Sequence, residues 1–261
     1  MRRRLGLVAA LVAAIAVASA GIAFAVTRPP NTTTLAVVAD EFRVRGTGVA
    51  DAIVPIHGFQ AGEAVIPALA AYDTPAPPPG AVPAAVLPNP THEGYPLVVS
   101  VIEATDDGSW LRVRLPKRPN GSVGWVRATE LRTWAVPNRI EVQLSTNQLR
   151  VYEGDSDRVL FAASVSTGTA STPTPLGDFF IDIIVPLDGH QVYGWGQMSV
   201  SGFSNVFERF GGGIGQIAIH GWNNDSVMGR SASNGCVRMR NVDIAQVAAL
   251  APLGTPVTIV A

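Results

Sequence analysis

The chain of 261 residues contains one cysteine, Cys236, and so cannot form an internal disulfide. Its folded parts must therefore be held together by hydrophobic cores alone. The 26 glycines and 20 prolines are typical of a protein with many turns between short strands. We therefore expect a mainly β fold, in which the lone thiol serves intermolecular pairing, is buried and inert, or is reactive.

The first 26 residues have the pattern of an export segment. Three arginines, Arg2 to Arg4, precede an apolar run over residues 5–26. Two small-x-small sites, at 18–20 and 23–25, suit signal peptidase, whereas the length of the run approaches the ~20 residues that span a bilayer. Residues 1–26 are thus predicted to be a signal peptide or a signal anchor. Both place the remaining chain outside the cytoplasm, in the cell wall or periplasm, with membrane contact only through this segment.

The composition argues against several classes of function. The formal net charge of −1 provides no basic surface for nucleic acid. His, Cys, Asp and Glu show no metal-site spacing, so we expect no metal and no other cofactor. The glycine-rich run at 211–215 lacks the Lys and Ser or Thr of a phosphate-binding loop, and we interpret it as a turn.

The first half of the mature chain predicts a linker and then a small β domain. Residues 27–64 show no clear period, and we interpret them as linker or leave them unassigned. The proline-rich stretch at 74–96 is either a linker or a long loop inside the β domain. Short strand patterns follow, with an Asn-Gly hairpin turn at 120–121. Residues 65–133 resemble bacterial SH3-like modules, which implies a small SH3-like barrel that binds cell-wall material or acts as a spacer.

The second half, residues 139–261, predicts a separate, mostly antiparallel β domain. Residues 140–144 and 148–152 alternate between apolar and polar side chains, as half-buried strands do. Residues 243–251 form the one helix candidate, near the C-terminus, with Asn241 as a candidate N-cap.

Cys236 lies in this second domain, in the sequence Ser-Asn-Gly-Cys-Val-Arg-Met. A catalytic cysteine needs a base, most often histidine, to take its proton. His220 follows an apolar strand, whose end would hold the imidazole rigidly. Gly235 lets a substrate carbonyl approach closely and backbone amides converge. Arg238 shares a face with Cys236 in an extended segment, where it would either bind a substrate carboxylate or stabilise the loop through backbone carbonyls.

These residues together resemble the signature of the L,D-transpeptidase catalytic family. The likeness runs from Arg139 to Ala261 and includes the Pro-Thr-Pro-Leu-Gly run at 173–177 and the closing Gly-Thr-Pro-Val-Thr-Ile at 254–259. It implies a β-sandwich-like fold and the formation of 3→3 peptidoglycan cross-links. The implied partners are a donor tetrapeptide stem and the diaminopimelate amine of an acceptor stem. The resemblance also implies that carbapenems acylate the cysteine.

The resemblance assigns a role to each matching residue. Cys236 would form the acyl-enzyme, with His220 as general base and the Gly221 carbonyl accepting from the other ring nitrogen. The amides of Gly235 and Cys236 would form the oxyanion hole. The substrate site would be shaped by Ser233, Asn234, Gly235 and Arg238. Many members have histidine at the position of Asn234, and since Asn cannot act as a base, His220 is the one candidate for that role.

Two other functions are compatible with the same residues. A cysteine L,D-carboxypeptidase would trim stem peptides with water as the acceptor, and acceptor binding rather than the motif separates the two reactions. A non-catalytic cell-wall-binding protein would rely on the SH3-like module. A binding protein has no use for Cys236 together with His220, Gly235 and Arg238, so we expect the transpeptidase.

Overall fold

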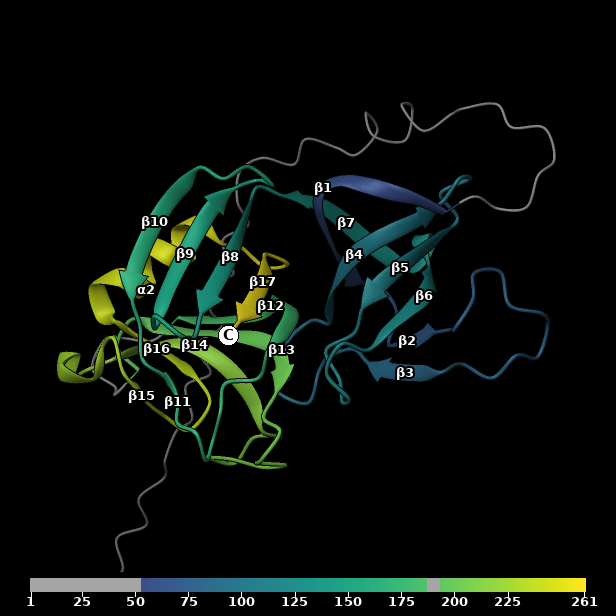
Figure 1. Ribbon diagram of the computed structural model, residues 1–261. Helices are drawn as coiled ribbons and strands as arrows, with labels where there is room; N and C mark the ends of the chain where they lie inside the picture. The colour runs from purple at the N-terminus through teal and green to yellow at the C-terminus, as the bar shows by residue number, and fades with distance from the viewer. Residues whose placement is uncertain (1–52, 187–192) are drawn as a thin grey trace, which may run out of the picture. The chain divides into compact units, whose positions relative to one another are not determined.

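The computed structural model describes residues 53–186 and 193–261. The predicted export segment and the linker residues before 53 lie outside these ranges. Within them, no helix combines the length and the apolar character needed to cross a membrane. Most of the described chain belongs to two β sheets, one on each side of residue 137 in the sequence (Figure 1).

The first sheet is antiparallel, with its strands in the order β6-β5-β4-β1-β7. A separate hairpin of two short strands, β2 and β3, precedes most of this sheet in the chain. These strands are β1 (Ile53–Ala64), β2 (Ala68–Ala71), β3 (Ala85–Pro88), β4 (Val98–Thr105), β5 (Trp110–Arg114), β6 (Val123–Arg127) and β7 (Leu131–Val136). Leu69, Val99, Val113 and Val126 are fully buried in their shared apolar core.

The structure bears on two of the sequence interpretations here. β1 falls inside the predicted linker of residues 27–64, so the last part of that segment is a strand. The sequence pattern did not predict β1, because Pro55 and the left-handed Gly58 (φ +76°) coincide with a register shift that breaks the alternation. The proline-rich stretch at 74–96 contains β3 and is a loop of the β domain rather than a linker. The SH3-like barrel over residues 65–133 stays a prediction.

The second sheet has eight strands in the order β10-β9-β8-β17-β12-β13-β14-β16. The pairs β8–β17 and β14–β16 are parallel, and the other pairs are antiparallel. The strands are β8 (Asn138–Gln143), β9 (Gln148–Glu153), β10 (Val159–Ser164), β12 (Gly177–Pro186), β13 (Gly196–Phe203), β14 (Gln216–Trp222), β16 (Val237–Arg240) and β17 (Pro256–Val260). A short parallel pair, β11 (Thr167–Gly168) with β15 (Ser231–Ser233), lies outside this sheet.

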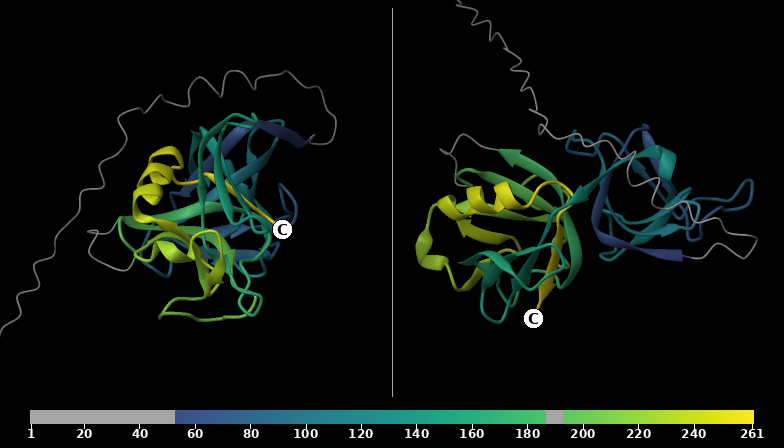
Figure 2. Two further views of the ribbon diagram at one scale, coloured as in Figure 1. Left: turned by 60° about the vertical axis from the view of Figure 1, so that its left-hand side comes forward. Right: turned by 90° about the horizontal axis from the view of Figure 1, so that it is seen from above.

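The long strand β12 makes this sheet curve into a near-barrel. Its first residues, Gly177 to Phe180, pair with β17, whereas those from Ile181 onward pair with β13. One apolar core joins buried side chains from both halves of the sheet, such as Val142 and Ile219. The predicted mainly β fold is confirmed, and Figure 2 shows the curvature from two further sides.

Helix α2 (Asn241–Leu250) is the one α-helix in the described ranges. It adds Ile244 and Val247 to the same core. The predicted short helix near the C-terminus is therefore confirmed. The predicted N-cap is wrong, because the helix begins at Asn241 itself and its N-cap, Arg240, makes no side-chain hydrogen bond.

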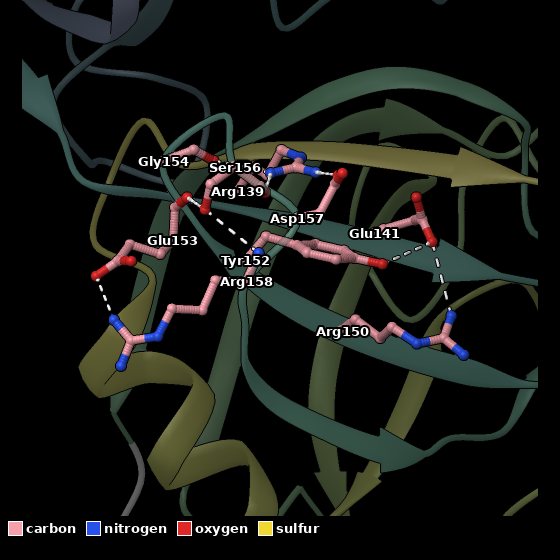
Figure 3. A network of polar contacts seen from close by, with 9 residues as sticks. All are labelled: Arg139, Glu141, Arg150, Tyr152, Glu153, Gly154, Ser156, Asp157 and Arg158. Atoms are coloured by element: carbon pink, nitrogen blue, oxygen red, sulfur yellow. Dashed lines mark hydrogen bonds and ion pairs between the residues drawn. The ribbon is translucent and has the colours of Figure 1, made fainter.

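A polar network covers one side of the β8–β9 hairpin (Figure 3). The Arg139 guanidinium lies 4.2 Å from the centre of the Tyr152 ring and donates to the carbonyls of Gly154 and Ser156, at 2.9 and 2.6 Å. The Tyr152 hydroxyl lies 3.4 Å from a carboxylate oxygen of Glu141. These contacts tie the hairpin strands to the turn that follows them.

Candidate active site

The adjacent strands β14 and β16 bring the predicted base and nucleophile together. In their parallel pairing, Ile219 is opposite Val237, and His220 is opposite Arg238. Ile219 and Val237 belong to the core, so His220 and Arg238 lie on the other face of the sheet. Cys236 directly precedes Val237 in the chain, so continued strand alternation places its side chain on the same face, diagonal to His220. Strand geometry separates such diagonal Cα atoms by roughly 8 Å, a span that two side chains on the same face can bridge.

His220 is held in one tautomer. Its side chain is 4% exposed, and Nδ1 lies 2.7 Å from the Gly221 carbonyl oxygen. A carbonyl can only accept, so Nδ1 carries the proton and Nε2 is left as a proton acceptor. Burial lowers the pKa of His220 to about 4; the Gly221 hydrogen bond opposes this, and the Arg238 charge adds to it. The imidazole is therefore neutral at pH 7, as a general base must be.

Cys236 is a free, partly exposed thiol. Burial raises its pKa, while a hydrogen bond from the Ala218 backbone and the Arg238 charge lower it. The net direction is upward, so the thiol is protonated at neutral pH. Cys236 and His220 are therefore both neutral at pH 7.

Ser233 organises the loop that carries the nucleophile. Its hydroxyl donates to the Cys236 carbonyl at 2.5 Å and accepts from the Gly235 amide at 3.1 Å. Gly235 has φ +116°, a conformation open to glycine and unfavourable for other residues. The predicted part of the Gly235 amide in an oxyanion hole is not seen, because the Ser233 oxygen occupies that donor. Asn234, next in the loop, is exposed.

Arg238 contacts the backbone of the loop and an aromatic ring of β14. Nη1 donates to the Ala232 carbonyl at 3.0 Å, and the guanidinium lies 3.9 Å from the centre of the Trp222 ring. The backbone contact stabilises the loop, as one interpretation expected. Nε is buried and has no hydrogen-bond partner among the described residues.

Two aromatic side chains flank the imidazole. The Tyr193 ring lies edge-on to His220 at a centroid distance of 4.4 Å, and Trp222 lies at 5.8 Å. Trp222 follows His220 by two residues on the same strand, so strand alternation could have predicted its place on this face. Tyr193 lies far away in sequence and shows no pattern that connects it to the site.

The described part of the chain contains no group of three or more His, Cys, Asp or Glu side chains placed to hold a metal ion. The candidate site instead combines a thiol, an imidazole, a guanidinium, a hydroxyl and two aromatic rings. These groups belong to Cys236, His220, Arg238, Ser233, Tyr193 and Trp222.

Comparison with known proteins finds a similar family over the second half of the chain. Residues 137–259 match the YkuD family, described as the L,D-transpeptidase catalytic domain. The YkuD protein of Bacillus licheniformis is 35% identical over 124 residues, or 48% of this chain and 66% of that protein. The YkuD protein of Bacillus subtilis is 29% identical over 126 residues, or 48% of this chain and 68% of that protein. The chain thus spans just under two thirds of the first of these relatives.

Among solved structures, one similar to this chain is the catalytic domain of the L,D-transpeptidase from Enterococcus faecium. The aligned region covers 47% of this chain and 96% of that domain. The sequence identity is 18% and the TM-score is 0.36.

Proposed function

Since residues 137–259 match the model of the L,D-transpeptidase catalytic domain family, we propose that this protein belongs to that family and cross-links peptidoglycan stem peptides outside the cytoplasm, with Cys236 as nucleophile and His220 as general base. The observation that carries the proposal is the protonation of this pair. A neutral imidazole, fixed through Nδ1 to the Gly221 carbonyl, shares one sheet face with the only thiol of the chain. Such an arrangement suits acyl transfer through a thioester.

The acylation step begins when His220 Nε2 takes the thiol proton as the Cys236 sulfur attacks the carbonyl before the terminal D-Ala of a tetrapeptide stem. The tetrahedral intermediate collapses with cleavage of the peptide bond. The D-Ala amine leaves with the proton returned by His220, and the acyl group remains on Cys236 as a thioester.

The second step transfers this acyl group. The side-chain amine of diaminopimelate on a neighbouring stem attacks the thioester carbonyl, and His220 accepts a proton from the incoming nitrogen. A 3→3 amide cross-link forms, and the sulfur leaves and recovers its proton from His220. The neutral state of His220 suits it to accept a proton in each half-reaction.

Arg238 carries a positive charge that can bind the terminal carboxylate of the donor stem. The tetrapeptide ends in a carboxylate, and Arg238 holds a buried nitrogen without a partner on the catalytic face. The aromatic ring of Trp222 fixes the guanidinium from one side. We assign Arg238 to the donor carboxylate and Ser233 to the shape of the nucleophile loop.

The test is the intact mass of the full-length chain after incubation with a carbapenem, followed by reaction with tetrapeptide stems. We expect one drug adduct per chain. The adduct should be lost in Cys236→Ala and should form at least ~100-fold more slowly in His220→Ala. With stems, the product should be a dimer that has lost one D-Ala.

Two results would contradict the proposal in different ways. A tripeptide product without any dimer would identify a carboxypeptidase that uses the same pair with water as acceptor. A folded wild-type chain that gains no mass and leaves the stems intact would favour a wall-binding protein. Cys236→Ser, which keeps nearly the same volume, is the matched control for folding.

A further inference from the structure

Asn241 is the first residue of α2, yet its side chain does not cap the helix. Nδ2 donates to the side-chain oxygen of Asn223 at 2.7 Å. Oδ1 is buried and has no hydrogen-bond partner within the described residues. A buried acceptor without a partner costs about 1–3 kcal/mol, so the placement of this amide calls for an explanation.

The amide fills a space left by two glycines. A Cβ atom built on Gly194 or on Gly221 would overlap the Asn241 side-chain oxygen. A Cβ on Gly221 would also contact the backbone carbonyl oxygen of Tyr193. Three separate segments of the chain therefore converge on one polar side chain: the residues before β13, the end of β14 and the start of α2.

Gly221 contacts the imidazole of His220, and Gly194 is the chain neighbour of a residue that contacts it. The Gly221 carbonyl accepts the hydrogen bond from His220 Nδ1 at 2.7 Å. Gly194 follows Tyr193, whose ring contacts His220 at 4.4 Å. The Asn241 amide thus packs against Gly221, which holds the hydrogen-bond acceptor of His220, and against Gly194, which follows Tyr193.

We propose that Asn241 is a positioning residue for the catalytic base. Its amide supports the Gly221 and Tyr193–Gly194 backbones, so that His220 keeps its proton on Nδ1 and presents Nε2 to the thiol. The inference deepens the proposed function, because it assigns to that reaction a residue that touches neither substrate nor nucleophile. A misplaced base would slow proton transfer by about tenfold to a hundredfold.

The decisive readout is the His220 tautomer, measured by ¹⁵N NMR of the imidazole nitrogens in the full-length chain. We expect one Nδ1–H tautomer in the wild type and a mixture of tautomers in Asn241→Ala, with carbapenem acylation slowed at least about tenfold. Asn241→Asp keeps the shape but adds a carboxylate near the ring. It should favour the imidazolium and move the acid limb of the acylation rate to higher pH. Gln246→Ala, at an exposed site on the same helix, should change neither readout.

Three results would overturn the assignment. The first is a wild-type tautomer and rate in folded Asn241→Ala. The second is a rate lowered equally at all pH values with the Nδ1–H tautomer intact, which would mean that Asn241 only supports the fold. If Asn241→Ala does not fold, the nearly isosteric Asn241→Asp provides the test instead. The third contradicting result is then an acid limb of the acylation rate in Asn241→Asp that is identical to that of the wild type. The NMR readout needs no substrate, so failure of the transpeptidase proposal would show separately, as a wild-type chain that forms no dimer.

Discussion

Arg238 influences, through its charge, the pKa values of both proposed catalytic groups, His220 and Cys236. A cation near His220 disfavours the imidazolium and lowers the pKa of that group. The same cation favours the thiolate of Cys236, against the larger effect of burial. Arg238 therefore helps to keep the base neutral and also eases ionisation of the nucleophile.

Arg238→Gln should raise the pKa of His220 above its value of about 4, because the charge that opposes protonation is removed. The acid limb of Cys236 acylation should move to higher pH by the same amount. NMR titration of the imidazole and the pH dependence of acylation measure the two shifts. Arg240→Gln is the matched control, since this exposed arginine on the same strand pairs with Asp225 and Asp243. Equal shifts in both variants would contradict the specific role of Arg238.

The candidate residues of the motif could be named from the sequence because they match the motif of the family that the chain resembles. Cys236, His220 and Gly221 needed no knowledge of the loop conformation, and the Gly221 carbonyl lies where the resemblance placed it. The Gly235 amide was misjudged, because its partner depends on how the loop folds back onto Ser233. Tyr193 could not be found, because nothing in its local sequence connects it to a strand that follows much later.

Among the secondary structure elements, the β8–β9 hairpin has surface contacts that should contribute unequally to stability. Arg139 donates to two backbone carbonyls and stacks on Tyr152, with its side chain 25% exposed. Arg158 forms an ion pair with Glu153 at 2.8 Å, with side-chain exposures of 67% and 51%. Water and salt screen the second contact far more than the first.

Arg139→Ala should lower the free energy of unfolding by about 1–2 kcal/mol, because it removes hydrogen bonds to backbone carbonyls together with the ring contact. Arg158→Ala should change it by less than about 0.5 kcal/mol. Urea unfolding of the two variants provides the comparison. Neither should change the rate of Cys236 acylation. Similar losses of unfolding free energy in both variants would show that the Arg139 contacts stabilise the hairpin no more than the Arg158–Glu153 ion pair does.

Element prediction succeeded where alternation is regular and failed where the backbone departs from it. β8 alternates between buried and half-buried residues throughout, and β9 does so from Gln148 to Tyr152, so both were identified from sequence. β1 was missed because Pro55 and Gly58 interrupt the pattern at a register shift. The N-cap assignment to Asn241 failed because the side chain found contacts in β14 and before β13, which the local sequence does not contain.

At the scale of the whole molecule, two buried groups link stability to pH in opposite directions. Asp182 on β12 accepts from Gln216 Nε2 at 2.6 Å, and its other oxygen is buried without a partner among the described residues. Burial raises the pKa of Asp182 to about 7, although the Gln216 hydrogen bond opposes the shift. Its protonated form favours the fold, so this contribution is full below the unfolded pKa of about 4 and is lost as pH rises to about 7. His220 behaves oppositely: its contribution is full above about pH 6.5 and is lost as pH falls towards about 4.

Asp182→Asn should therefore be stabilised relative to the wild type, and increasingly so between about pH 4 and pH 7. The change across this range should be roughly 2–4 kcal/mol, after which the difference should level off. Thermal unfolding at a series of pH values tests this, with Asp106→Asn at an exposed turn as control. A difference that stays constant with pH would show that Asp182 is ionised in the folded protein throughout.

The hydrogen-bond ladder between β14 and β16, rather than the length of the chain that connects them, sets the spacing of base and nucleophile. A slip of one residue would turn Cys236 into the core and Val237 towards the substrate, so the site has one working register and no intermediate ones. The exposed crossover at residues 223–230 is under no such restriction. An insertion there would leave the register of β14 and β16, and with it the spacing of His220 and Cys236, unchanged.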